Sequence, residues 1–157
     1  MIFKVGFSKD THNLIEGSEV VLGGIKIPSN KSVQAYSDGD VLFHSLAEAI
    51  FGSLGLEDLG QNYNPKNMEE NFNSSLMVQD ALKELKDKEF HISNIDILIE
   101  LDSPKLTEWK SVIKENVSKL IGVDLDQISI KATTTEGNFP NLITSYCNIA
   151  IYKGEVK

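Results

Sequence analysis

Two short segments carry side chains of the types that bind metal ions. Asp10 and His12 are two residues apart, so in an extended strand both point to the same side. His44 follows in the segment from Ser37 to His44, which reads Ser-Asp-Gly-Asp-Val-Leu-Phe-His. If the fold brings His44 beside Asp10 and His12, two histidines and one carboxylate leave a fourth position open, as in catalytic zinc sites. Taken alone, Asp10 and His12 are more typical of a polar surface.

Two acidic residues flank His44 at helical spacing. A helix that begins near Asp40 places Asp40, His44 and Glu48 on one face. Asp40 or Glu48 could then orient His44 from behind, as carboxylates commonly do for histidine ligands. Alternatively, Asp38 or Asp40 is the N-cap of this helix, which explains one acid but not His44.

Hydroxyl groups and a carboxylate end a later strand. In Lys131-Ala132-Thr133-Thr134-Thr135-Glu136, the three threonines could donate to phosphate oxygens and Glu136 could hold a hard cation such as Mg²⁺. A threonine-rich strand without any ligand explains the same residues. Upstream, the segment from Asp102 to Leu106 reads as a loop entering a helix, where free N–H groups and Lys105 could meet an anion. A capped helix start explains it as well.

The elements that must position these groups follow from periodicity and turn residues. We expect a strand at the N-terminus, a hairpin over 19–28 around Gly23 and Gly24, a helix from about Asp40 to Leu54, and a long surface loop over 57–73. A second helix is expected after a cap at Ser74 or Ser75, a buried strand over 91–101, a third helix directly after Ser103-Pro104, and strands over 128–133 and 143–152. This mixed order predicts an α+β domain over 1–157, a two-layer α/β sandwich with a mixed sheet and helices on one face.

Composition excludes several classes of protein. The chain has 157 residues, 24% charged, with a net charge of −8. That balance argues against a phosphate-tracking nucleic-acid surface, so no nucleic acid is expected as a partner. No apolar run approaches the roughly 18 residues of a membrane span, and no signal peptide is visible. A single cysteine, Cys147, fits a reducing compartment, so a cytoplasmic location and no membrane partner are expected.

Several motifs in order resemble one enzyme family. Residues 37–52 are similar throughout to the signature of the 2-C-methyl-D-erythritol 2,4-cyclodiphosphate synthase family. Supporting matches are Gly6-Phe7, Asp10-Thr11-His12, Gly23 to Pro28, Asp58-Leu59-Gly60, Ser103-Pro104-Lys105 and Lys131 to Glu136. The resemblance extends from Gly6 to about Glu136.

The resemblance implies a homotrimer with active sites between subunits. It implies one Zn²⁺ per chain on Asp10, His12 and His44, and a second cation, Mg²⁺ or Mn²⁺, at Glu136. It assigns the ribose of a cytidine diphosphate substrate to Asp58, Leu59 and Gly60, the cytosine to the loop from Leu101 to Thr107 and the phosphates to Thr133 and Thr134. The implied catalytic residues are Thr134, Tyr36 and Glu136. The implied substrate-binding residues are Ser37, Asp58, Leu59, Gly60, Asp102, Ser103, Pro104, Lys105, Leu106, Thr133, Thr134, Thr135 and Phe139.

The implied reaction converts 4-diphosphocytidyl-2-C-methyl-D-erythritol 2-phosphate to the 2,4-cyclodiphosphate and CMP. The nucleophile, the substrate's own 2-phosphate, is already anionic. Charge neutralisation and an in-line geometry are therefore what the protein must supply. Two other readings share the same ligands: a trimeric zinc- and nucleotide-binding protein without turnover, and a hydrolase that uses zinc-bound hydroxide and gives a linear product.

The chain departs from the family pattern at three places. Tyr36 stands where the family usually has His, and it carries no positive charge near pH 7. Tyr63-Asn64-Pro65 replaces the usual Phe-Pro-Asp, and Gly137 to Ile143 replaces a Gly-rich segment with an Arg. The sequence is therefore a divergent member, and we expect slower turnover than in relatives with the histidine.

Overall fold

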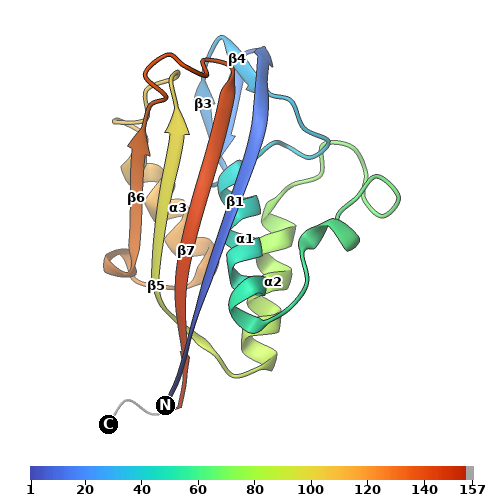
Figure 1. Cartoon of the computed structure of the whole chain (residues 1–157), viewed down its shortest axis with the longest axis vertical. Helices are drawn as coiled ribbons and strands as arrows, with labels where there is room; N and C mark the ends of the chain where they lie inside the picture. Colours follow the sequence, from blue (N-terminus) through green and yellow to red (C-terminus); the bar gives the residue numbers. More distant parts are fainter. Residues whose placement is uncertain (155–157) are drawn as a thin grey trace.

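A computed structural model describes residues 1–154 and contains a five-stranded mixed sheet (Figure 1). The strand order is β4-β1-β7-β5-β6, with β4 (Lys31–Val33), β1 (Ile2–Glu16), β7 (Leu142–Lys153), β5 (His91–Leu101) and β6 (Ile128–Thr133). Among the strands of the described residues, only β5 and β6 pair in parallel. A separate hairpin joins β2 (Glu19–Leu22) to β3 (Ile25–Pro28), and Gly23 and Gly24 at its turn both have the positive φ that favours glycine.

Three helices lie on one face of the sheet (Figure 1). They are α1 (Val41–Leu54), α2 (Ser75–Asp87) and α3 (Lys110–Ile121), with short 3₁₀ turns η1 (Leu59–Gln61) and η2 (Leu125–Gln127). The predicted α+β class with a mixed sheet and helices is confirmed. In the part of the chain that the structure describes, no helix is both long and apolar enough to cross a membrane.

The core lies between the helices and the sheet. Ile95, Ile97 and Ile99 of β5 alternate into it, are fully buried, and belong to the same core as the apolar side chains of α1. The other face of the sheet has no helix over it among the described residues. Phe3, Val5 and Phe7 of β1 lie there, 61 to 72% exposed.

A glycine sets the distance between β1 and α1. A Cβ placed on Gly6 would lie 1.9 Å from the backbone oxygen of Ala49. Glycine is therefore required at this position for α1 to pack this closely on β1. This contact matters for the site because β1 carries Asp10 and His12 while α1 carries His44.

Two expectations about the elements need correction, and the structure defines the extent of the first strand, which the sequence had left open. The third helix begins at Lys110, so residues 102–109 form a loop, and the first helical bonds end on the Leu106 carbonyl. Ser74 makes no side-chain cap bond to α2, because its hydroxyl bonds elsewhere. The first strand continues to Glu16, although Ser8, Asp10 and His12 on its inner face are polar. These inner-face side chains belong to the site and not to the apolar core. The strand therefore lacks the alternation of apolar and polar residues that would have predicted its full length.

Candidate metal and substrate site

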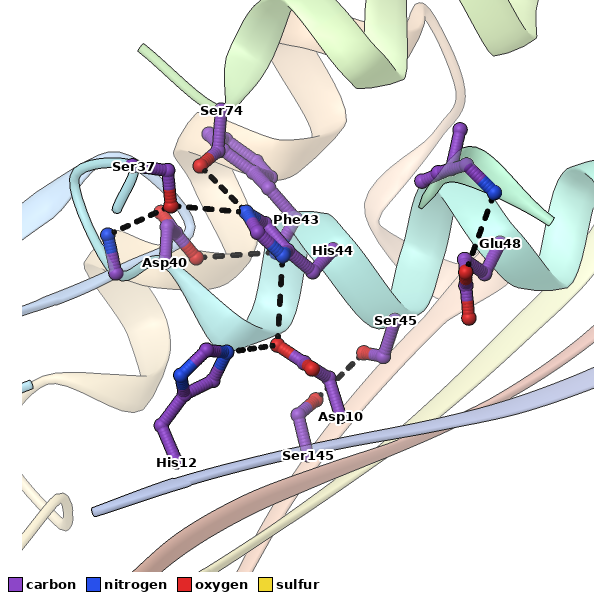
Figure 2. A network of polar contacts seen from close by, with 12 residues as sticks. Asp10, His12, Ser37, Asp40, Phe43, His44, Ser45, Glu48, Ser74 and Ser145 are labelled. Atoms are coloured by element: carbon purple, nitrogen blue, oxygen red, sulfur yellow. Dashed lines mark hydrogen bonds and ion pairs between the residues drawn. The ribbon is translucent and has the colours of Figure 1, made fainter. Parts of the chain in front are cut away.

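Asp10, His12 and His44 meet at the inner face of β1, where α1 crosses it (Figure 2). His12 Nε2 lies 3.2 Å from Asp10 Oδ2, and His44 Nδ1 lies 3.5 Å from the same oxygen. One ligand atom from each residue lies within 4.8 Å of the others. The predicted triad is therefore assembled within one chain.

A hydrogen bond determines which ring nitrogen of His12 carries the proton and which has a lone pair available for a metal ion. The Nδ1 atom of His12 lies 3.1 Å from the Gln34 carbonyl oxygen, which can only accept, so Nδ1 carries the proton. Nε2 then presents its lone pair toward Asp10. His44 is held at its other nitrogen, because Nε2 lies 3.1 Å from Ser37 Oγ and 2.9 Å from Ser74 Oγ.

The three ligand atoms fit a divalent cation. Asp10 Oδ2 is buried and has no well-aligned hydrogen-bond donor, although two histidine nitrogens face it. A buried acceptor without a partner is costly, and a cation between these atoms would satisfy all three. The pKa of His12 is raised because its ring bonds to the Asp10 carboxylate when protonated, whereas burial lowers the pKa of His44.

Asp40 and Glu48, the two acids expected to orient His44, bind other groups instead. The Asp40 side chain caps α1, accepting from the Phe43 N–H at 3.0 Å and also from the N–H groups of Gly23 and Gly24 at 3.0 and 2.7 Å. Glu48 accepts from the Ser8 hydroxyl and the Leu59 N–H, both at 3.3 Å. The prediction that either orients His44 was wrong, because nearby backbone N–H groups engage both carboxylates.

A cavity of about 290 Å³ opens onto the triad. Its remaining lining comes from α1, η1, the start of α2 and the adjoining loops: Ala35, Tyr36, Ser37, Glu48, Leu59, Gly60, Tyr63, Pro65, Phe72 and Met77. Asp58 lies beside it at the start of η1, where its carboxylate accepts from the Gly60 N–H at 3.0 Å. The Tyr36 hydroxyl donates to the Met68 carbonyl at 3.0 Å.

The second group of predicted residues lies at the ends of β5 and β6, across β7 from β1 (Figure 1). Asp102 accepts from the backbone N–H and the hydroxyl of Thr135, at 2.6 and 2.8 Å. Thr134 donates to Glu136 at 3.2 Å, and Phe139 is 58% exposed. Within the described chain, none of residues 102–106 or 133–139 lines the cavity at the triad. Within the described residues, the predicted site residues therefore lie in two separate groups.

Comparison with known proteins identifies the family. The model of the YgbB family matches residues 3–151, nearly the whole chain. The chain belongs to the YgbB family.

Relatives and solved structures agree with this assignment. This YgbB protein is 36% identical to the 2-C-methyl-D-erythritol 2,4-cyclodiphosphate synthase of Aquifex aeolicus over 155 residues, 98% of this chain and 99% of that one. A solved structure of a 2-C-methyl-D-erythritol 2,4-cyclodiphosphate synthase in a CDP-bound form has a TM-score of 0.88 at 26% identity, and the match covers 95% of this chain and 100% of the other. The bifunctional IspDF of Campylobacter jejuni has a TM-score of 0.91 at 31% identity; the match covers 98% of this chain and 43% of that protein.

Sequence reasoning missed several residues of this YgbB site. Ser74 was expected only as a cap, Tyr63 was noted only as part of a departure from the family pattern, and Gln34 and Ser8 were given no role. Tyr63 stacks on Phe72 and donates to Asp80, which fixes one wall of the cavity. None of these has a local signal, because each contacts the site from a different part of the chain.

Proposed function

We propose that this protein cyclises 4-diphosphocytidyl-2-C-methyl-D-erythritol 2-phosphate to 2-C-methyl-D-erythritol 2,4-cyclodiphosphate and releases CMP, a step in isoprenoid precursor synthesis. The observation that carries the proposal is the Asp10, His12 and His44 cluster at the mouth of a cavity. It lies in a chain of the YgbB family with synthases as full-length relatives.

The cation is proposed to be Zn²⁺, one per chain. Two imidazole nitrogens and one carboxylate oxygen are the donor set of catalytic zinc sites. Bound there, Zn²⁺ would act as a Lewis acid on phosphoryl oxygens. Asp10 also keeps its negative charge close to both histidines, which offsets part of the charge of the ion.

The cavity residues would hold the substrate for in-line attack. Ser37 offers a hydroxyl beside the triad. Asp58, which precedes the lining residue Leu59 at the start of η1, offers a carboxylate to the ribose hydroxyls. The rigid wall from Tyr63 and Phe72 would fold the substrate so that its 2-phosphate approaches the β-phosphorus.

A homotrimer would join the two groups of site residues. Within one chain, Thr133, Thr134, Thr135, Glu136 and Phe139 lie away from the triad, as do Asp102, Ser103, Pro104, Lys105 and Leu106. A neighbouring copy could supply them, with Glu136 holding a second cation, Mg²⁺ or Mn²⁺, and Thr134 contacting the phosphates. The apolar sheet face around Phe3, Val5 and Phe7 supports such an assembly, since exposed apolar patches commonly mark interfaces.

The function is tested by following CMP release and the mass of the second product. A cyclic product supports the proposal, whereas a linear product, heavier by one water, indicates the hydrolase. Absence of CMP with Zn²⁺ and Mg²⁺ present, together with retained CDP binding, indicates the binding protein. Glu136→Gln should lower the rate and raise the Mg²⁺ requirement.

The assembly and the metal are tested separately. Light scattering should give about three times 17.4 kDa, and a monomer that still turns over substrate would exclude shared sites. Elemental analysis should give one zinc per chain, and His44→Ala should lose it while remaining folded.

A further inference from the structure

Ser74 contacts His44 from outside the cavity lining (Figure 2), and the carboxylate of Asp38 in turn contacts Ser74. Ser74 is completely buried, and its Oγ lies 2.9 Å from His44 Nε2. The same hydroxyl donates to Asp38 Oδ1, while the Ser74 N–H donates to Asp38 Oδ2 at 3.1 Å. These contacts connect segments 30 and 36 residues apart in sequence.

The contacts among Asp38, Ser74 and His44 determine which atoms donate and which accept. The Ser74 hydroxyl donates to the Asp38 carboxylate, so its single proton points to Asp38. Ser74 Oγ can then only accept from the imidazole, so His44 carries its proton on Nε2. The lone pair is left on Nδ1, the nitrogen that faces Asp10.

We propose that Asp38 and Ser74 are positioning residues that fix the tautomer and ring orientation of His44 for metal binding. The inference rests on the metal site proposed above and adds the residues that organise it. In many zinc proteins a single carboxylate accepts directly from the histidine ligand and so orients it. Here the hydrogen-bonded series Asp38–Ser74–His44 would have the same effect, with the serine hydroxyl between the carboxylate and the imidazole.

The same contacts connect the substrate pocket to the metal ligand. The Asp38 N–H donates to the Phe72 carbonyl at 3.1 Å, so the segment that ends the long loop is bonded to the segment that begins α1. Ser37 Oγ also lies near His44 Nε2 and accepts from the Gly39 N–H. Because Nε2 is a donor, the Ser37 proton cannot point to His44 and remains available on the cavity side.

The first test measures zinc affinity by competition with a chromophoric chelator for the wild type, Ser74→Ala, Ser74→Thr and Ser53→Ala. Ser74→Ala should bind zinc 10- to 100-fold more weakly, the usual effect of losing such a partner. Ser74→Thr keeps the hydroxyl and should bind more tightly than Ser74→Ala. Ser53→Ala is the matched control, because Ser53 is a buried serine of α1 whose hydroxyl donates only to the Ile50 carbonyl at 2.7 Å. It should bind zinc as the wild type does.

The second test measures the tautomer of His44 directly, first in the wild type and then in Asp38→Asn. In metal-free wild type at pH 8, ¹⁵N-edited histidine spectra should show His44 protonated on Nε2. Asp38→Asn should show both tautomers of His44. The amide can donate to Ser74 Oγ, which lets the Ser74 hydroxyl donate to His44 Nε2 instead of accepting from it.

The outcomes separate the two proposals. Wild type that binds no zinc overturns the metal site itself. Zinc binding that is unchanged in a folded Ser74→Ala protein, or a proton on Nδ1 of the metal-free wild type, leaves the metal site standing and overturns the role of Ser74. A single Nε2–H signal in Asp38→Asn removes Asp38 from the proposal.

Discussion

Substitution of Gly6 by alanine should separate β1 from α1 and loosen the metal site. In a strand interior, Gly→Ala ordinarily stabilises by about 0.4–1 kcal/mol, because it restricts the unfolded chain. Here the added Cβ would lie 1.9 Å from the Ala49 oxygen and 2.9 Å from the Ser53 nitrogen, which are backbone atoms. Neither can rotate away as a side chain would.

The size of the effect follows from that overlap. Ordinary contact needs about 3.4 Å or more between these atoms, so helix and strand must move apart by roughly 1 Å or more. Forced repacking of a core costs about 1–3 kcal/mol, and a clash between two backbones belongs at the upper end. We therefore expect Gly6→Ala to lose about 3 kcal/mol of unfolding free energy. Zinc affinity should fall as well, because Asp10 and His12 move relative to His44.

Gly52→Ala provides the matched control on the facing helix. A Cβ on Gly52 meets only the Phe7 oxygen at 4.0 Å, an ordinary contact. Since alanine favours a helix by about 1 kcal/mol over glycine, this variant should be as stable as the wild type or more so. Urea unfolding in chelator at fixed protein concentration measures both. A Gly6→Ala protein with wild-type stability would refute the close packing of β1 on α1.

Three further predictions concern the site and the core. In the metal-free protein, the pKa of His12 is higher in the folded state than in the unfolded state. The pairing of His12 with Asp10 therefore stabilises the folded protein fully at a pH below the unfolded-state pKa of His12, and this stabilisation is lost as the pH rises through the folded-state pKa. The stability difference between wild type and His12→Ala in urea titrations should therefore be largest below about pH 6.5 and shrink as the pH rises above it; a constant difference would count against the pairing. Burial of Cys147 raises its pKa to about 12, so iodoacetamide at pH 8 should alkylate it only after unfolding, and equal native and unfolded rates would contradict its placement. Tyr36→His should raise the rate of CMP release by roughly one to two decades, the worth of a charge-assisted hydrogen bond to a phosphate, and no gain would show that another donor already fills that role.

The sequence by itself determined the parts of the site that depend on neighbours along the chain. The spacing of Asp10 and His12 placed both on one side of a strand. Asp40 and Gly55 bounded α1 because capping is a contact between residues a few positions apart. The motif around His44 predicted the third ligand, and the hairpin turn at Gly23 and Gly24 followed from the same local rules.

Tertiary structure alone decided what surrounds those ligands. Nothing near Ser74 in the sequence indicates that its hydroxyl bonds to Asp38 rather than capping α2. Likewise, only the strand order shows that Glu136 and the triad lie on different parts of one chain. The physical reason is that helix caps and strand alternation depend on bonds within a few residues. The partner of a buried hydroxyl or imidazole depends instead on which segments the core packs together, and the approach of α1 to β1 at Gly6 sets that packing.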